Sequence, residues 1–428
     1  MLSHFFRTPA AKFVSTLLFA GLLTCGASAA TAPASGSTEP VATIRSLLKA
    51  MQQGDEAAAL DIYRSATDPA AHVWAAMVLE RIHFRLDAAS ADAKLCEDDL
   101  IDNKPGIALL CGQFRSGDLR LAGKRGEADE VERELVKRFQ GHGVDKALAD
   151  MQSYLAGEGD ALTLNYEQPA GDVSIPLKEN WSPVFEATAN SHAFDLMLDT
   201  GATDLVLGTE QAHALGVRLL DQKVPVGGWL STNIQAQRGL LDELKFGGIT
   251  LRHVPVTVVP RSIALIGVNL MAPLGALRIS HQALVVYGSK STVPACDTQI
   301  LAGSNLWGSS LRLFPELLVN DKPQAVQLDT GASRYLLGTK QALDEVTTLH
   351  RGKIPFGDIG GSHPSANAES AKVKLTIAGQ PIETYFIVLT DSSSPHGITL
   401  GAGALRDMDF LIDFNRQHQC FLLHPDLH

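Results

Sequence analysis

Two different hydrophobic patterns divide this chain. From Val41 to about Leu155, apolar residues recur every three or four positions, as in the set Val41, Ile44, Leu48 and Met51. That spacing places the apolar side chains on one face of an α-helix. The pattern predicts several short helices in a helical region over residues 41–158. No 34-residue repeat is evident, so we expect a small bundle or an irregular helical repeat.

From Ala161 onward the pattern changes to short apolar runs. These runs are rich in Val, Leu, Ile and Phe, and they are separated by Gly, Pro and Asn. Such a texture is typical of β-strands joined by turns, and it predicts few helices in this half of the chain. The expected fold class is therefore mainly β, preceded by a small α-helical region.

The β-rich half also contains an internal duplication. Asp199-Thr200-Gly201-Ala202 recurs 130 residues later as Asp329-Thr330-Gly331-Ala332, and the similarity extends to both sides without a gap. Further matching segments follow in the same order in each copy. They are two strands around a glycine turn, an apolar run that ends at Gly267 or Gly401, and a closing hairpin. We therefore expect two related lobes.

Composition narrows the classes of partner. Apolar residues make up 45% of the chain and charged residues 19%, as in an ordinary globular protein. The formal net charge of −11 is spread along the chain, which disfavours nucleic acid and anionic membranes as partners. The 14 histidines are scattered, and no Cys-x-x-Cys or His-Glu-x-x-His spacing occurs. We therefore expect no metal and no cofactor.

The first 29 residues have the features of a signal peptide. Arg7 and Lys12 precede the apolar run Phe13 to Leu23, and Ala27-Ser28-Ala29 fits a cleavage site. We expect export to the periplasm or to the outside of the cell, with residues 30–40 as a linker. The apolar run is short for a membrane-spanning helix, so no stable membrane span is expected.

The chain contains five cysteines. Cys25 would leave with the signal peptide; the alternative is a lipid anchor at Cys25, which the preceding threonine disfavours. The other four are an even set in an apparently exported chain, which favours disulfides. Three pairings exist in principle, and four unpaired buried thiols are the alternative. Proximity favours Cys96 with Cys111, which leaves Cys296 with Cys420.

The repeated motif, the apolar residues before each copy and the apolar runs ending at Gly267 and Gly401 resemble the aspartic proteases. Two lobes on one chain are a pepsin-like feature, whereas the details of each lobe are retroviral-type, or retropepsin-like. The resemblance implies a bilobal acid-protease fold with two pseudo-symmetric β-barrel lobes, over residues 161–290 and 291–428. It leaves the helical region unexplained.

Asp199 and Asp329 are the expected catalytic residues. A glycine lets the backbone fold tightly beneath such a carboxylate, and a threonine hydroxyl can hydrogen-bond to the facing loop. Two facing carboxylates cannot both ionise easily, so the pair shares one proton and can activate a water. The residues expected to support this dyad are Thr200, Gly201, Thr330 and Gly331.

The resemblance also implies hairpin flaps that close over a substrate. One candidate runs from Val226 to Asn233 and the other from Phe356 to Pro364. Trp229 stands where pepsin-like flaps carry a tyrosine. The alternatives are that Trp229 is a core aromatic and that the Gly-Gly pairs are ordinary turns. The candidate flap residues are Gly227, Gly228, Trp229, Gly360 and Gly361.

We therefore expect an exported aspartic endopeptidase that acts on polypeptides and is active as a single chain. The motifs end in Ala202 and Ala332, where the most acid-active pepsins have a hydroxyl, and this predicts an optimum at mildly acidic to near-neutral pH. The alternative function is a non-catalytic peptide-binding or scaffold protein that keeps the fold. A removable inhibitory prosegment is a further interpretation of the helical region.

Overall fold

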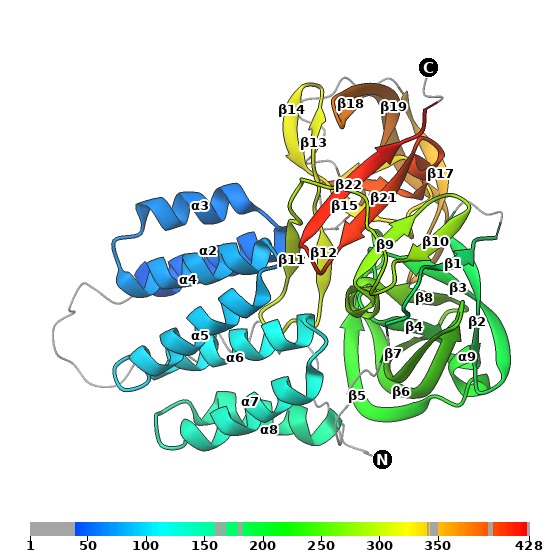
Figure 1. The fold of residues 1–428 in the computed structure, drawn as a ribbon. Coiled ribbons are helices and arrows are strands. Elements are labelled where there is room, and N and C mark those ends of the chain that lie inside the picture. The colour runs from blue at the N-terminus through cyan, green and yellow to red at the C-terminus, as the bar shows by residue number, and fades with distance from the viewer. Residues whose placement is uncertain are drawn as a thin grey trace, which may run out of the picture.

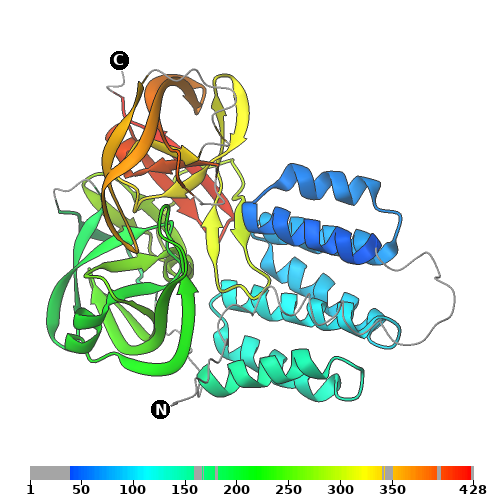
Figure 2. The ribbon, with the colours of Figure 1, turned by 180° about the vertical axis from the view of Figure 1, so that it is seen from behind.

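The computed structural model describes residues 39–158, 166, 168–178, 182–339, 342, 350–392 and 397–425. An array of helices lies beside two lobes of β-structure, as Figures 1 and 2 show from opposite sides. This confirms the predicted fold class, which is mainly β and bilobal with helices near the N-terminus. The expected signal peptide, Cys25 and most of the expected linker lie outside the described residues.

Seven helices occupy the described chain from Glu39 to Glu158, and together they are called the helical array below. The carboxylates of Asp55 and Asp68 cap two of them by accepting a backbone N–H three residues further on. The rings of Trp74 and Phe114 meet edge to face in its core, with centroids 5.6 Å apart. The helices are α2 (Glu39–Gln53), α3 (Glu56–Ser65), α4 (Pro69–Ile82), α5 (Leu86–Leu100), α6 (Pro105–Leu121), α7 (Arg125–Arg138) and α8 (Asp145–Glu158).

The first lobe is a curled seven-stranded sheet. Its strands are β2 (Val184–Ala189), β3 (His192–Asp199), β4 (Leu205–Gly208), β5 (Arg218–Val226), β6 (Ile234–Phe246), β7 (Ile249–Val259) and β8 (Ala264–Gly267). They follow in the order β2-β3-β8-β4-β7-β6-β5, and β2 also pairs with β6, which curls the sheet toward a barrel. The turn between β6 and β7 consists of Gly247 and Gly248, both with positive φ, as the sequence predicts. Two short helices, α9 (Thr209–Ala214) and α10 (Val268–Met271), follow β4 and β8.

The second lobe repeats this plan. Its strands are β13 (Glu316–Val319), β14 (Lys322–Ala325), β15 (Gln327–Asp329), β16 (Leu336–Thr339), β17 (His350–Asp358), β18 (Gly361–Ile377), β19 (Gln380–Leu389) and β20 (Ile398–Gly401). In this lobe β15 pairs parallel with β20, and β16 lies between β19 and β20. In the first lobe β3 pairs parallel with β8, and β4 lies between β7 and β8. The shared pairing agrees with the duplication read from the sequence.

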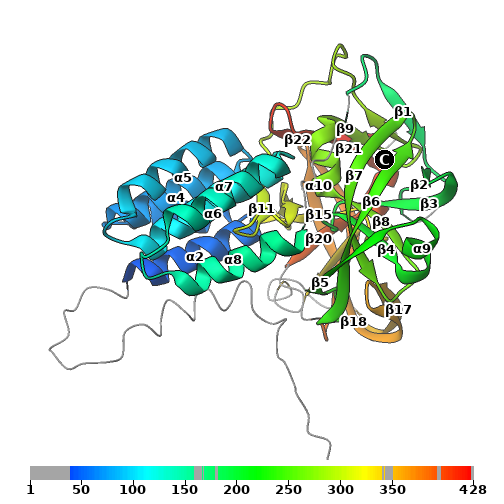
Figure 3. The same ribbon diagram turned by 90° about the horizontal axis from the view of Figure 1, so that it is seen from below.

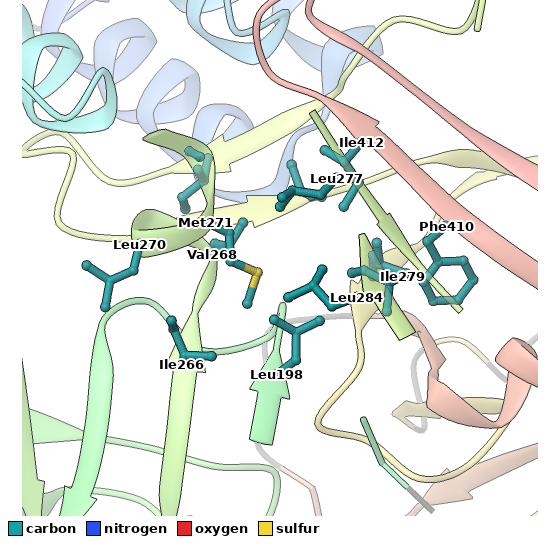
Figure 4. Packing of buried hydrophobic residues seen from close by; sticks show 14 of the residues in the cluster. Leu198, Ile266, Val268, Leu270, Met271, Leu277, Ile279, Leu284, Phe410 and Ile412 are labelled. Atoms are coloured by element: carbon teal, nitrogen blue, oxygen red, sulfur yellow. The ribbon is translucent and has the colours of Figure 1, made fainter. Parts of the chain in front are cut away.

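A five-stranded sheet joins the two lobes. The repeat predicts a closing hairpin in each lobe, and both hairpins form: β9 (Ala276–Ile279) with β10 (Ala283–Val286), and β21 (Met408–Asp413) with β22 (His418–Leu423). However, β9 also pairs with β21, so the hairpins close a single sheet in the order β1-β10-β9-β21-β22, in which β1 is Val173–Pro176. Figure 4 shows Leu277, Ile279 and Ile412 of this sheet packing near Leu198, which directly precedes Asp199.

A small hairpin connects the helical array to the lobes. It consists of β11 (Ala302–Ser304) and β12 (Leu311–Leu313). Strand β11 packs against α2 and α4, whereas β12 packs against β15 and α10 (Figure 3). Two short 3₁₀-helices also lie in the lobes: η1 (Ala272–Leu274) follows α10, and η3 (Ala402–Arg406) follows β20. The hairpin therefore runs from the helices to the strand that ends at Asp329.

Both disulfides favoured by the sequence are present. Cys96 bonds to Cys111 and joins α5 to α6, with the two Cα atoms 5.9 Å apart. Cys296 bonds to Cys420 on β22, with the Cα atoms 5.8 Å apart. The alternative of four unpaired thiols is therefore wrong. In the described residues, no helix has the length and apolar character needed to cross a membrane.

Candidate active site

The two aspartates of the repeated motif lie at equivalent ends of β3 and β15. Each sits opposite a glycine on the neighbouring parallel strand, Asp199 opposite Gly267 and Asp329 opposite Gly401. The two glycines predicted to form structural loops therefore have the same place in both lobes. A Cβ on Gly267 would lie 2.3 Å from the carbonyl oxygen of Thr203, and one on Gly401 would lie 2.4 Å from that of Ala332.

The structure brings the two aspartates together across the lobes. A Cβ atom on Gly201 would lie 2.4 Å from Cγ of Asp329, and a Cβ atom on Gly331 would lie 2.5 Å from Cγ of Asp199. Each glycine thus lies beneath the carboxylate of the opposite lobe. Any larger residue at either position would displace that carboxylate, because real Cβ contacts do not occur at such distances.

The two threonines lock the facing loops together. The Thr200 hydroxyl donates to the carbonyl of Leu328 at 2.9 Å, and the Thr330 hydroxyl donates to the carbonyl of Leu198 at 2.7 Å. Each hydroxyl also accepts the backbone N–H of the other threonine, at 3.0 and 3.1 Å. Both side chains are fully buried. The four bonds are symmetric, so they fix the lobes at the place where the carboxylates meet.

Hydrogen bonds also orient each carboxylate. Oδ1 of Asp199 accepts the backbone N–H groups of Gly201 and Ala202, at 2.8 and 3.1 Å. Oδ1 of Asp329 accepts those of Gly331 and Ala332, at 3.0 and 3.2 Å. In both loops the other oxygen is left for the facing carboxyl group and for a reactant. All four motif residues predicted to support the dyad thus contact it or its partner loop.

Both predicted flaps are hairpins, and their tips meet. Gly227, Gly228 and Trp229 lie in the turn between β5 and β6, whereas Gly360 and Gly361 lie at the turn between β17 and β18. A Cβ on Gly228 would lie 2.7 Å from an oxygen of Asp358, and one on Gly360 would lie 2.2 Å from Ser231. Gly228 and Gly360 therefore allow close packing between the two tips, whereas a Cβ on Gly361 would meet nothing within 4 Å and one on Gly227 would make only an ordinary contact with Ser231.

One carboxylate holds the tips together. Asp358 accepts the backbone N–H groups of Leu230 and Ser231, each at 2.8 Å, and the Ser231 hydroxyl at 2.7 Å. We call these contacts of Asp358, Leu230 and Ser231 the latch. Although burial raises the pKa of Asp358, hydrogen bonds from Leu230, Ser231 and Gly360 lower it to about 2. The latch carboxylate is therefore ionised over the whole working range of pH.

The chain was compared with known proteins. Residues 185–270 match the model of the aspartyl protease family, and this segment contains Asp199 and ends just after Gly267. The first lobe is similar to the aspartyl proteases. The match confirms the family resemblance for this part of the chain, while the second lobe, with Asp329, lies outside the matched residues. No curated protein matches the chain.

Two solved structures of aspartic proteases also match. A retropepsin-like aspartic protease from Rickettsia conorii is 21% identical, over 28% of this chain and 93% of that chain, with a TM-score of 0.22. The aspartic proteinase from Irpex lacteus is 15% identical, over 59% of this chain and 98% of that chain, with a TM-score of 0.38.

The environment of the repeated motif raises the pKa of both aspartates. Burial raises the pKa of Asp199 well above its ordinary value, and the charge of Asp329 and a hydrogen bond between the two groups raise it further. Burial also raises the pKa of Asp329. A hydrogen bond between two carboxyl groups requires that one of them is protonated. The pair therefore holds one proton between its two ionisations.

Sequence reasoning missed two charged residues at this site. Arg312, on β12, donates to the Thr203 hydroxyl at 3.0 Å, and its charge opposes the raised pKa of both aspartates. Asp358 lies inside the predicted second flap, yet an aspartate near a Gly-Gly pair normally indicates only a turn. Neither residue belongs to a motif, and Thr203 and Leu230, to which Arg312 and Asp358 bond across the lobes, lie more than 100 residues away from them in the sequence.

Trp229 lies where the two lobes meet. It lies at the tip of the first flap, and it packs on a cluster of the second lobe that includes Leu337 and Leu389. Its backbone carbonyl also accepts the hydroxyl of Ser392 at 2.7 Å. The ring is thus a contact between the lobes rather than part of the core of one lobe.

The latch predicts how the flaps respond to a loss of charge. In Asp358→Asn, the backbone amides of Leu230 and Ser231 keep at most a neutral acceptor, so we expect their hydrogen exchange to be about tenfold faster. Exchange measured by mass spectrometry on peptides over residues 226–233 checks this. Asp391→Asn is the matched control, because Asp391 is exposed and accepts a side-chain bond from Asn367 at the surface. Unchanged exchange in Asp358→Asn would show that the latch does not hold the tip.

Proposed function

We propose that this chain is an aspartic endopeptidase whose catalytic residues are Asp199 and Asp329. The observation that carries the proposal is the reciprocal packing of the two motifs, in which the glycine of each lobe lies beneath the carboxylate of the other. A structural role does not require a buried acid and a half-buried acid at one point, because bringing like charges together away from water is costly. Their raised pKa values suit acid–base chemistry.

The chemistry follows from the shared proton. The ionised carboxylate takes a proton from a water held between the two groups, and the water oxygen attacks the carbonyl carbon of the peptide bond. The protonated carboxyl donates its proton to the carbonyl oxygen, which forms a neutral tetrahedral diol. The carboxyl group that took the proton from water then donates it to the leaving nitrogen, and the other carboxylate takes a proton from one hydroxyl of the diol. The C–N bond breaks to give a carboxylic acid and an amine, and the dyad again holds one proton. No covalent intermediate with the protein forms, and the backbone N–H groups on Oδ1 of each aspartate hold the carboxyl groups in place throughout.

The proposed substrates are polypeptides in extended form. The two flap tips meet at the latch, so a substrate enters only after Asp358 releases Leu230 and Ser231, and closing again excludes water. Both aspartates lie on one chain, which supports a protein that is active without a partner copy. We propose the helical array as an integral part of this enzyme, as argued below.

The pKa values of the dyad predict the pH at which peptidase activity is highest. Burial and mutual repulsion raise the pKa values of the dyad, and Ala202 and Ala332 supply no hydroxyl that would stabilise the ionised form. Both limbs of the profile of kcat/KM against pH therefore lie at higher pH than for ordinary carboxyl groups. We expect a maximum between about pH 5 and 7, measured with a fluorogenic peptide. A profile that peaks only at strongly acidic pH would contradict this.

The proposal is tested by digestion of casein and of a peptide library across a pH series. A statine-type inhibitor, which mimics the tetrahedral intermediate, should block the cleavage. The alternative function, a peptide-binding or scaffold protein without turnover, predicts that peptides bind and are recovered intact at every pH. The presence of both carboxylates with their supporting threonines favours the peptidase.

Export is also a proposal. Two disulfides, one in the helical array and one in the β-structure, suit an oxidising compartment. The signal peptide over residues 1–29 remains a prediction from the sequence. Sequencing of the N-terminus of the mature protein after expression in a secreting host would locate the cleavage site, which we expect after Ala29.

A further inference from the structure

We propose that Arg312 is a positioning residue for the dyad, which ties the second lobe to the Asp199 loop and holds one positive charge beside both carboxylates. This inference rests on the proposed function for its kinetic readout. Nη1 of Arg312 donates to the Thr203 hydroxyl at 3.0 Å and to its neighbour's carbonyl, Leu311, at 2.8 Å. Thr203 directly follows Asp199-Thr200-Gly201-Ala202.

The internal repeat gives this arginine no counterpart in the first lobe. The repeat places Ser182 at the first-lobe equivalent of Arg312, and it places Ser333 at the equivalent of Thr203. The dyad is symmetric in its glycines, threonines and backbone hydrogen bonds. Arg312 is thus a single cation set against two acids, and it breaks the symmetry between the lobes.

The helical array supports the strand that carries Arg312. The turn Asn305–Gly308, between β11 and β12, inserts into the array. The buried guanidinium of Arg81 donates from Nη1 to the carbonyls of Asn305 and Leu306, each at 3.1 Å. Gly117 on α6 is so close that a Cβ there would lie 2.3 Å from the carbonyl oxygen of Leu306. The turn is therefore held firmly, and β12 leads from it to Arg312.

Three other charged residues near the motifs or at the flap tips have a partner or are exposed. Asp204, on the first-lobe side, accepts from Arg238 at 2.9 Å. Asp358 is engaged in the latch, with His363 at 3.2 Å. Arg334 follows the second motif, but it is exposed. Among the described residues, Arg312 is the cation whose charge opposes the raised pKa of both aspartates.

The sign of the effect follows from the charge. A cation favours the ionised form of a carboxyl group, so its removal raises both pKa values of the dyad. In Arg312→Gln, both limbs of the kcat/KM profile should therefore move to higher pH, by about 0.5 to 1 pH unit. We express kcat/KM at each pH as a fraction of the variant's own maximum. At a given pH on the acid limb, this fraction should fall by about three- to tenfold relative to the wild type, and on the basic limb it should rise by the same factor.

Companion variants separate charge from structure. Arg312→Lys keeps the charge but loses the planar fork, so the limbs should stay in place even if the maximum falls. Thr203→Asp supplies a carboxylate that neutralises Arg312 in place, and it should move the limbs to higher pH as Arg312→Gln does, which keeps the test available if Arg312→Gln fails to fold. Arg334→Gln is the matched control, since it removes an exposed arginine and should leave the profile unchanged.

The variants distinguish an effect of the Arg312 charge from a purely structural effect. If Arg312→Gln and Thr203→Asp lower kcat/KM equally at every pH, Arg312 is only structural and the inference is wrong. It is also wrong if Arg334→Gln moves the limbs by the same amount. Titration of carboxyl carbons by NMR in ¹³C-aspartate protein, assigned with Asp199→Asn and Asp329→Asn, follows the dyad without turnover. If the wild type cleaves nothing but this titration moves to higher pH in Arg312→Gln, the proposed function fails and the inference stands.

Discussion

Asp199→Asn and Asp329→Asn are each expected to lower kcat for peptide hydrolysis by about 10²- to 10⁴-fold. An amide can neither take a proton from water nor exchange one with the opposite carboxyl group. Because one group must act as base while the other acts as acid, the loss of either side should be nearly as damaging as the loss of both. The double variant therefore tests whether the two aspartates form one unit. Initial rates with a fluorogenic peptide at the optimum pH of the wild type measure the effect.

Two controls distinguish lost chemistry from lost structure. Asp195→Asn lies on the same strand as Asp199, but its side chain is exposed, and its rate should equal that of the wild type. Equal activity of Asp199→Asn or Asp329→Asn with the wild type would assign the chemistry to other residues.

Stability gives the second control. Because burial raises the pKa of both aspartates in the folded state, their contribution to stability is greatest at low pH and is lost as pH rises from about 4 through the folded pKa. Asn does not ionise, so the Asn variants should lose less stability than the wild type as pH rises. At pH 7 they should unfold at or above the wild-type temperature. A calorimetric series over pH measures this, and a lower Tm for either variant at pH 7 would attribute its loss of rate to misfolding.

The features that follow from local sequence could be predicted. Helices follow from apolar residues at helical spacing, and the Gly247-Gly248 turn follows from the conformational freedom of glycine. The duplication then adds one piece of long-range information, because two copies of one motif imply one shared site. Gly201 and Gly331 are part of that motif because only glycine fits beneath the opposite carboxylate.

The features that depend on contacts between unlike segments could not be predicted. Asp358 binds backbone groups, and any sequence offers a backbone N–H, so Leu230 and Ser231 carry no signal of their partner. Arg312 binds a threonine hydroxyl in the other lobe, and the internal repeat has no counterpart for it. The pairing of β9 with β21, which joins the lobes, could not be predicted either, since each hairpin by itself is a complete local structure.

The latch and Arg312 each break the symmetry of the two lobes. In the latch, Asp358 of the second flap tip accepts from Leu230 and Ser231 of the first, although the two tips are equivalent hairpins. Arg312 lies on a strand that packs against β15, and it donates to Thr203 of the first lobe. The symmetric parts thus bring the two carboxylates together, whereas the asymmetric contacts join the lobes elsewhere.

Arg81→Leu is the variant that should most destabilise the folded protein. The guanidinium of Arg81 is fully buried, its Nε donates to Asp118 at 2.6 Å, and it lies 3.5 Å above the ring of Phe114. Its removal leaves a buried carboxylate without a partner and leaves the carbonyls of Asn305 and Leu306 unpaired. We expect the free energy of unfolding to fall by about 3 to 5 kcal/mol, measured by urea denaturation.

The pH dependence and a double variant identify the cause. Burial raises the pKa of Asp118 to about 7, although Arg81 opposes this. In Arg81→Leu, Asp118 should be protonated at pH 5 and forced to ionise at higher pH, so the loss should be smaller at pH 5 than at pH 8. Arg81→Leu with Asp118→Leu removes both charges and should recover part of the loss. Lys104→Leu, which breaks the more exposed pair with Asp68, should cost less than about 1 kcal/mol.

The same variant decides between two roles of the helical array. An inhibitory prosegment holds the enzyme inactive, so weakening its attachment at Arg81 would raise peptidase activity. If the array instead supports β12 and thereby Arg312, Arg81→Leu should lower kcat/KM even at temperatures where the protein remains folded. We expect the second result, because Arg81 binds the turn that leads directly to Arg312. An increase in activity on loss of Arg81 would overturn the integral role and favour the prosegment.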